Sequence, residues 1–256
     1  MTYCVGLKLN DGLVLMSDTL TNAGFDNINR NKKMHTWSID RKRAIVLLTS
    51  GNLATSQASI NMINESIKTD SENIMKCNSM FQVARIIGKI LRQITREYVF
   101  DGQVAESPYS STFILGGQIR GDDPKLFLIY PEGNFIEATE DQPFFQIGET
   151  KYGKPSIVRA FDSKLTFGDA IKLLLISFDS TMKGNVSIGL PIDLCVLKNK
   201  DFKITNKIRI DENDKYFKNL SDGWAYSLKV AITKLPSFDF KKFEKNSEFE
   251  NEKFKY

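Results

Sequence analysis

The stretch that decides the fold is MTYCVGLKLNDGLVLMSD, residues 1–18. Every second residue from Tyr3 to Leu9 is apolar, so these side chains fall on one face of an extended chain. The turn signal Asn10-Asp11-Gly12 follows, and the segment Leu13–Ser17 is apolar again. This pattern predicts a β-hairpin at the start of the chain.

Farther along the chain, the apolar residues switch between the spacing of strands and the spacing of helices. Strands are predicted at 33–39, 44–50, 110–116, 125–130, 134–138, 192–198 and 202–210. Helices are predicted from about residue 52 and at 79–100, 151–161, 166–182 and 216–233. Two antiparallel sheets, each covered by a helix pair, would bury every apolar face, so we expect an α+β fold, a four-layer α-β-β-α sandwich. We expect one domain over residues 1–235 and a charged, phenylalanine-containing C-terminal arm over 236–256.

The composition is that of an ordinary globular protein. Of 256 residues, 41% are hydrophobic and 26% are charged, which excludes collagen, a long coiled coil and global disorder. The net charge of +4 is spread along the chain without a basic stripe, so no nucleic-acid partner is expected. No apolar run is long enough to cross a bilayer, so no membrane partner is expected.

Cysteine and histidine usage argues against a metal site. Three widely spaced cysteines and a single histidine, His35, lack metal-ligand spacing, so neither a metal nor another cofactor is expected. This cysteine usage is typical of a reducing cytosol, and no secretory signal is visible, so we expect a cytoplasmic protein. A Ser-His-Asp triad would need His35, whose neighbours are typical of a strand. Phosphate-loop and zinc-protease motifs are missing as well.

The start of the chain carries the remaining candidate nucleophile. Removal of Met1 would leave Thr2 with a free α-amine next to its hydroxyl. Such an amine titrates at about 7.7–8 and can accept the hydroxyl proton without a histidine. Many proteins begin Met-Thr for no catalytic reason, so the position of Thr2 does not decide the question alone.

The next 56 residues after Thr2 follow a recognisable order. Thr2 opens a strand that turns at a polar-Gly step and returns to Asp18, and Lys33 precedes an apolar residue on the following strand. Gly51 then marks a strand-to-helix turn within TSGNLATSQA, residues 49–58. This order resembles the start of proteasome-type N-terminal-nucleophile hydrolases.

Within that family, the chain resembles most the bacterial proteasome homologues called Anbu. The closer match is carried by TYCVG at 2–6, TNAG at 21–24, KMH at 33–35, SGNLAT at 50–55, IGETKYG at 147–153 and PIDL at 191–194. The resemblance extends in element order over residues 2–210 and is most specific in residues 2–58.

The resemblance implies a role for each matching residue. The Thr2 hydroxyl attacks a carbonyl, and Lys33 beside it lowers the pKa of the hydroxyl and of the amine. Asp18 pairs with Lys33 and orients it. The backbone N–H of Gly51, at a helix N-terminus, holds the oxyanion. Lys32, one position earlier, could take the place of Lys33 in this pattern. The alternative for Asp18 and Lys33 is an ordinary surface ion pair, and the alternative for Gly51 is an ordinary strand-to-helix turn.

The supporting polar residues match less well. Ser187 matches a serine of the family, but the residue three before it is Gly184 instead of Asp, and Asp179 is the nearest upstream acid. Where the family usually has a serine-containing turn, this chain has Gly148-Glu149-Thr150-Lys151. These residues normally orient the Thr amine, so their departure leaves the activity open.

The resemblance therefore implies a threonine-type peptidase that forms an acyl-enzyme on Thr2 after Met1 is removed. It also implies self-association into a ring or a helix, with a peptide as the substrate. No ATPase motif is visible, so an unfolding partner would be a separate protein. Two alternatives stay open: a non-peptide amidohydrolase of the same superfamily, and a catalytically silent assembly protein that keeps the fold.

Overall fold

The computed structural model describes residues 1–22, 28–69, 72–98 and 108–241. Its centre is a pair of five-stranded sheets whose paired strands are all antiparallel. The first sheet has the order β10 (Phe144–Gly148), β1 (Tyr3–Leu9), β2 (Gly12–Asp18), β11 (Ile192–Lys198) and β12 (Asn206–Ile210). The second has the order β5 (Met34–Ile39), β6 (Arg43–Gly51), β7 (Ser111–Ile119), β8 (Lys125–Ile129) and β9 (Phe135–Glu137).

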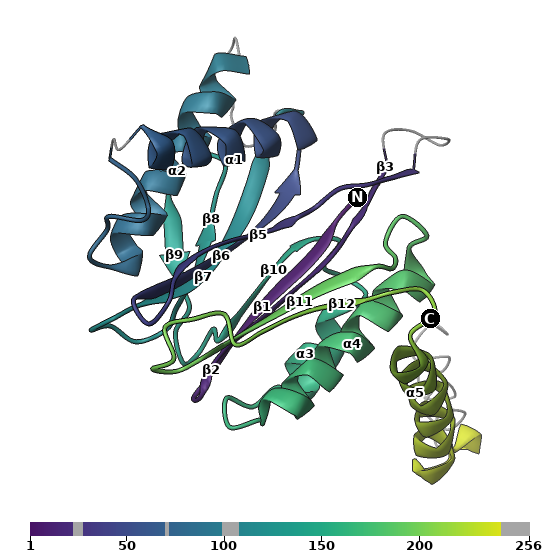
Figure 1. Cartoon of the computed structure of the whole chain (residues 1–256). Coiled ribbons are helices and arrows are strands. Elements are labelled where there is room, and N and C mark those ends of the chain that lie inside the picture. The colour runs from purple at the N-terminus through teal and green to yellow at the C-terminus, as the bar shows by residue number, and fades with distance from the viewer. Residues whose placement is uncertain (23–27, 70–71, 99–107, 242–256) are drawn as a thin grey trace, which may run out of the picture. The chain divides into compact units, whose positions relative to one another are not determined.

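Helices cover the outer faces of both sheets (Figure 1). Helices α1 (Leu53–Lys68) and α2 (Met80–Tyr98) pack on the second sheet. Helices α3 (Lys154–Ala160) and α4 (Phe167–Gly184) pack on the first. This arrangement confirms the predicted α+β four-layer sandwich.

Successive side chains of β1 point to opposite faces of the sheet, so the hairpin contributes to two layers of the core. Tyr3, Val5 and Leu7 are buried against the helix side, whereas Cys4 is buried in the layer between the two sheets. The sheets approach closely at Gly6, where a Cβ atom would lie 2.9 Å from a methyl group of Leu126. Each fully buried aliphatic side chain of these layers contributes about 1.5–3 kcal/mol, so one misplaced strand register would be costly.

Several elements differ from the sequence-based expectation. The strand β10 was not expected, because five residues after Pro143 carry little periodicity and their pairing with β1 is long-range. The short pair β3 (Leu20–Asn22) and β4 (Ile28–Arg30) was also not expected. The strand expected at 202–210 begins only at Asn206, because the turn after β11 at 199–201 is followed by irregular backbone over 202–205.

Contacts along the chain separate two compact units, Met1–Leu220 and Ser221–Tyr256. The helix α5 (Lys215–Lys234) contains residues of both, and its Phe217 is buried in the core beside α3 and α4. The expected boundary at residue 235 remains a prediction, and residues 242–256 of the expected arm lie outside the described residues. None of the described helices combines the length and apolar character needed to cross a membrane. All three cysteines are buried and free.

Candidate active site

Thr2 lies directly before β1, at the end of the first sheet, and is 8% exposed. Its carbonyl oxygen accepts a hydrogen bond of 2.7 Å from the backbone N–H of Glu149, just after β10. Gly148 makes this approach possible, because its φ is +86° and a Cβ atom there would lie 1.9 Å from the Thr2 carbonyl oxygen. The β10 strand that the sequence did not predict therefore holds the candidate nucleophile in place.

Asp18 and Lys33 form a buried ion pair beside Thr2. Asp18 ends β2 with a fully buried side chain, and Lys33 enters from the other sheet, directly before β5. The Lys33 Nζ atom lies 2.7 Å from Asp18 Oδ1, and that oxygen also accepts a 2.9 Å hydrogen bond from the Tyr3 N–H. Lys33 also donates to the carbonyl oxygens of Leu20 and, at 3.2 Å, of Met1. One carboxylate thus joins the lysine to the start of β1.

The surroundings of this ion pair show which of the two lysines, Lys32 or Lys33, is the partner of Asp18. Lys33 is 4% exposed and contacts Asp18, whereas Lys32 is exposed. Burial raises the pKa of the Asp18 carboxyl, while Lys33 and the Tyr3 amide oppose that shift by stabilising the carboxylate. A buried lysine needs such a partner, since an uncompensated ammonium in the interior costs several kcal/mol, on the order of 3–5.

Gly51 ends β6 at the point where α1 begins. Its φ is +111°, and a Cβ atom there would lie 2.5 Å from the carbonyl oxygen of Ser110. Only glycine tolerates both conditions. The next residue, Asn52, is the N-cap of α1, and its side chain accepts a 3.0 Å hydrogen bond from the Thr55 N–H. The turn therefore places a backbone amide at the positive end of a helix.

Thr2, Lys33 and Gly51 line one cavity of about 900 Å³. Asp18 is not a lining residue, but it contacts Lys33, which is one. The wall is completed by Met1 and by residues of β3, of the segment 31–35, of the end of β6, of the first turns of α1 and of β10: Thr21, Asn31, Lys32, His35, Thr49, Ser50, Asn52, Leu53, Ser56, Gln57, Ile60, Asn61 and Gly148. The arrangement brings a hydroxyl, a lysine and a helix N-terminus to one solvent-accessible space.

His35 lines this cavity as well, although no catalytic role was expected for it. Its ring is stacked with that of Trp37, with the centroids 6.4 Å apart. Burial, reinforced by the charge of Lys32, lowers the pKa of His35 to about 4, so its imidazole is neutral near pH 7.

With Met1 attached, the nitrogen of Thr2 is an amide and cannot act as a base. The amine is then that of Met1, and burial, followed by the charge of Lys33, lowers its pKa. Removal of Met1 would free Lys33 from the Met1 carbonyl and leave the Thr2 amine close to the same lysine.

The sequence matches a model of a known family over most of its length. The family model, described as "Proteasome subunit", covers residues 2–197. The chain belongs to the proteasome subunit family. No curated protein matches the chain.

Solved structures of Anbu proteins are similar to this proteasome-family chain. Anbu from Hyphomicrobium sp. strain MC1 is 46% identical over 93% of this chain and 100% of its own, with a TM-score of 0.85. Anbu from Yersinia bercovieri is 37% identical over 93% of this chain and 99% of its own, with a TM-score of 0.88. The helical assembly of the Anbu complex from Pseudomonas aeruginosa is 38% identical over 94% of this chain and 99% of its own, with a TM-score of 0.87.

Ser187, the supporting serine expected from the proteasome pattern, is not among the described residues that line the cavity. A chain of hydrogen bonds connects its backbone to Thr2. Its backbone N–H donates to Asn185 Oδ1 at 2.9 Å, and Asn185 Nδ2 donates to Glu149 Oε2 at 2.9 Å. The Glu149 N–H in turn binds the Thr2 carbonyl. The sequence showed Glu149 as a departure from the family, but its pairing with Asn185 could not be read from spacing.

Packing explains why glycine occupies position 184. A Cβ atom at Gly184 would lie 2.6 Å from the ring of Tyr152, so the aspartate of the family pattern would require Tyr152 to move. Asp179, the nearest upstream acid, is buried on α4 and does not line the cavity. The expected supporting residues thus differ from the family pattern, whereas Thr2, the Asp18–Lys33 ion pair and the glycine turn follow it.

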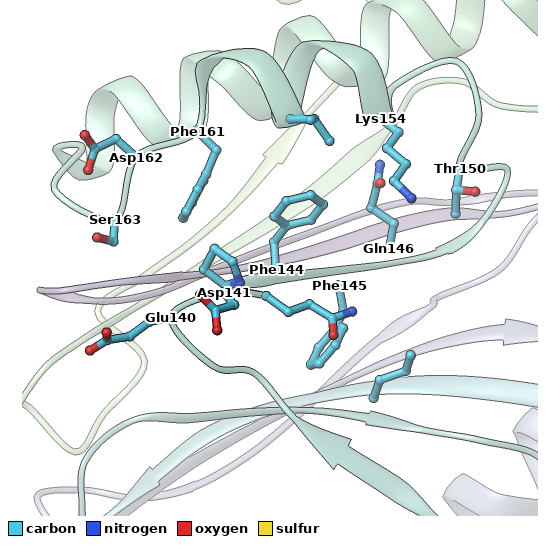
Figure 2. Close-up of a pocket in the computed structure, with 14 residues that line it drawn as sticks. Glu140, Asp141, Phe144, Phe145, Gln146, Thr150, Lys154, Phe161, Asp162 and Ser163 are labelled. Carbon is cyan, nitrogen blue, oxygen red and sulfur yellow. The ribbon is translucent and has the colours of Figure 1, made fainter.

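A second cavity of about 650 Å³ lies beside β10 and α3 (Figure 2). The rings of Phe144 and Phe161 meet there with centroids 5.9 Å apart. Glu140, Asp141 and Asp162 line it together with one cation, Lys154. It contains neither the buried ion pair nor the glycine turn of the Thr2 cavity.

Proposed function

We propose that the chain is a threonine-type peptidase of a self-assembling, proteasome-like particle. The observation that carries the proposal is the 2.7 Å Lys33–Asp18 pair, which is buried next to Thr2 in a cavity that Gly51 also lines. The Anbu complex from Pseudomonas aeruginosa forms a helical assembly, which supports self-association of this chain into a ring or a helix. Free, buried cysteines fit a reducing compartment, and we assign the particle to the cytoplasm.

The proposed reaction proceeds through an ester on Thr2. After Met1 is removed, the Thr2 amine accepts the proton of the hydroxyl while Oγ attacks the carbonyl carbon of the peptide bond. The C–N bond then breaks, and the departing amine takes the proton. Water next attacks the ester carbonyl carbon while the Thr2 amine accepts a proton from it. The bond between the acyl carbon and Oγ then breaks, Oγ takes the proton back from the amine, and the acid product leaves.

Each neighbour of Thr2 contributes to one part of this reaction. The Lys33 charge keeps the Thr2 amine neutral enough to act as a base, because like charges lower the pKa of an amine. Asp18 holds Lys33 charged and in place. The Gly51 N–H stabilises the negative oxygen of the tetrahedral intermediate, a contribution of about 3 kcal/mol to the barrier.

Two other functions remain as candidates. A catalytically silent assembly protein is favoured by the packing of Gly184 on Tyr152 and by the glutamate at position 149, since both depart from the family's supporting residues. A non-peptide amidohydrolase would use the same nucleophile chemistry on another C–N bond. Comparing peptidyl amides with non-peptide amides separates this candidate from a peptidase.

Covalent labelling tests the proposal directly. Full-length protein, with removal of Met1 established by N-terminal sequencing, is treated with a β-lactone probe, and the adduct is located by intact mass and peptide mapping. We expect one adduct on Thr2, none in Thr2→Ala, and almost none in Lys33→Ala. Lys198→Ala, an exposed lysine at the far end of β11, serves as the matched control and should label normally. A processed, assembled protein without any adduct or turnover would support the silent assembly protein.

A further inference from the structure

The Thr2 cavity carries an excess of positive charge in the part of the chain that the structure describes. Its lining includes Lys32 and Lys33 but no carboxylate. The charge of Lys33 is balanced by Asp18, whereas Lys32 has no ion-pair partner among the described residues. His35 adds no charge near pH 7, so Lys32 dominates the field inside the cavity.

Charged residues of β11 and β12 lie near enough to act on Lys32. Burial lowers the pKa of Lys32, the charges of Lys207 and Arg209 lower it further, and Asp193 opposes them. Arg209 is neutralised by Asp193 through two hydrogen bonds of 2.8 and 3.0 Å. Lys207, like Lys32, has no ion-pair partner within the described residues, so two cations near the cavity remain uncompensated.

Neutral donors stand next to these cations. The side chains of Asn31, Gln57 and Asn61 line the cavity and form no hydrogen bond to other described residues. Leu53 and Ile60 supply an aliphatic part of the same wall. A side chain with methylene groups and a terminal carboxylate would match both parts, since charge-assisted hydrogen bonds to a carboxylate are the strong ones.

We propose that the cavity selects substrates with a carboxylate side chain, glutamate or aspartate, on the acyl side of the scissile amide. Lys32 is the specificity-determining residue, and the amides of Asn31, Gln57 and Asn61 complete the carboxylate site. The acyl side is the part of the substrate that stays bound to Thr2 as an ester. Its contacts with the cavity therefore act both when the ester forms and when it is hydrolysed. This inference rests on the proposed peptidase function for the position of the scissile bond.

The test compares substrates that differ only at the residue before the scissile amide. Acetylated peptides ending in Glu, Gln or Lys are linked to the same fluorogenic amine and offered to full-length protein with Met1 removed. Glu and Gln have the same shape, so their ratio of kcat/KM isolates the charge. We expect Glu to exceed Gln by about tenfold at low salt and Lys to be the poorest, with the ratio falling as salt screens the field.

Matched variants assign the preference to Lys32. We expect Lys32→Gln to lower the Glu-to-Gln ratio about threefold to fivefold, as for one exposed charge, and Lys32→Arg to retain it. Lys198→Gln removes the same net charge away from the cavity and should leave the ratio unchanged. Equal rates for Glu and Gln, or an unchanged ratio in Lys32→Gln, would overturn the inference while leaving the hydrolase intact.

A binding measurement keeps the inference testable if no turnover is found. In Thr2→Ala, which cannot form an ester, calorimetry with the acetylated peptide amides should show tighter binding of the Glu form than of the Gln form. The same preference without turnover would retain the carboxylate site and reject the peptidase. Equal binding of the two forms would reject the carboxylate site.

Discussion

The cavity at Thr2 and the cavity beside α3 both border β10, yet their functional side chains are held in different ways. At Thr2 the Lys33–Asp18 ion pair is buried, and the glycine turn at Gly51 and the start of α1 line the same cavity. Beside α3 the charges of Glu140, Asp141 and Lys154 are exposed to solvent (Figure 2). A cavity becomes a candidate site when packing and hydrogen bonds hold its functional side chains in one position, and its volume alone does not make it one.

The largest contrast is expected when one lysine is removed from each cavity. Lys33→Met leaves the buried Asp18 carboxylate without its partner, so we expect a loss of about 3–5 kcal/mol in the free energy of unfolding. Labelling of Thr2 should slow by about 100-fold or more, since the amine loses the charge that lowers its pKa. Lys154→Met should change stability by less than about 0.5 kcal/mol. Urea denaturation and labelling rates measure both, and equal effects at the two lysines would remove the contrast.

The glycine turn of the Thr2 cavity can be compared with a glycine that belongs to neither cavity. Gly51→Ala combines a positive φ with a clash against Ser110, so we expect a loss of about 2–3 kcal/mol. Gly121 has a φ of +96°, but a Cβ atom there would meet nothing within 4 Å. Gly121→Ala should therefore cost only about 1 kcal/mol, the strain alone. Thermal unfolding of both variants separates clash from strain, and equal losses would refute the close approach at Gly51.

The pH dependence of stability should reveal the neutral imidazole in the Thr2 cavity. His35 has a pKa of about 4 in the folded chain against an ordinary value of 6.5, so the unfolded chain binds its proton first. Its contribution is complete above pH 6.5 and is lost as the pH falls toward 4, by on the order of 3 kcal/mol. His35→Gln should flatten the stability profile in this window. Parallel profiles for the two proteins would show that His35 is solvated.

The smallest effect is expected in the second cavity. Asp141→Asn changes an exposed carboxylate that has no part in the proposed reaction, so stability should shift by less than about 0.5 kcal/mol. Thr2 labelling and the Glu-to-Gln ratio should both stay at the level of the unmodified chain. A clear loss of labelling in Asp141→Asn would mean that the two cavities are coupled and that the contrast between them is incomplete.

Much of the fold was readable from local periodicity. The opening hairpin, the β6–α1 turn at Gly51 and the apolar stripe of α2 each lie within about two dozen consecutive residues, where spacing indicates the element. The strand β10 escaped because five residues carry too little periodicity, and its partner β1 is far away in the sequence. Periodicity compares residues that are close in the sequence, whereas strand pairing joins residues that are far apart in it.

The candidate site divides in the same way. Thr2 was proposed from the chemistry of its hydroxyl and a free α-amine, whereas Asp18, Lys33 and Gly51 came from the resemblance of residues 2–58 to proteasome-type hydrolases. Tertiary structure decided that Lys33, and not Lys32, meets Asp18, and it excluded Ser187 from the described cavity wall.

Tertiary structure also decided the charge of the cavity, whose walls come from segments around residues 1–2, 31–35, 49–61 and 148. Sequence determines which side chains are available and which local elements present them. The free energy that places them together comes from burying both sheet faces at once, and that depends on the whole chain.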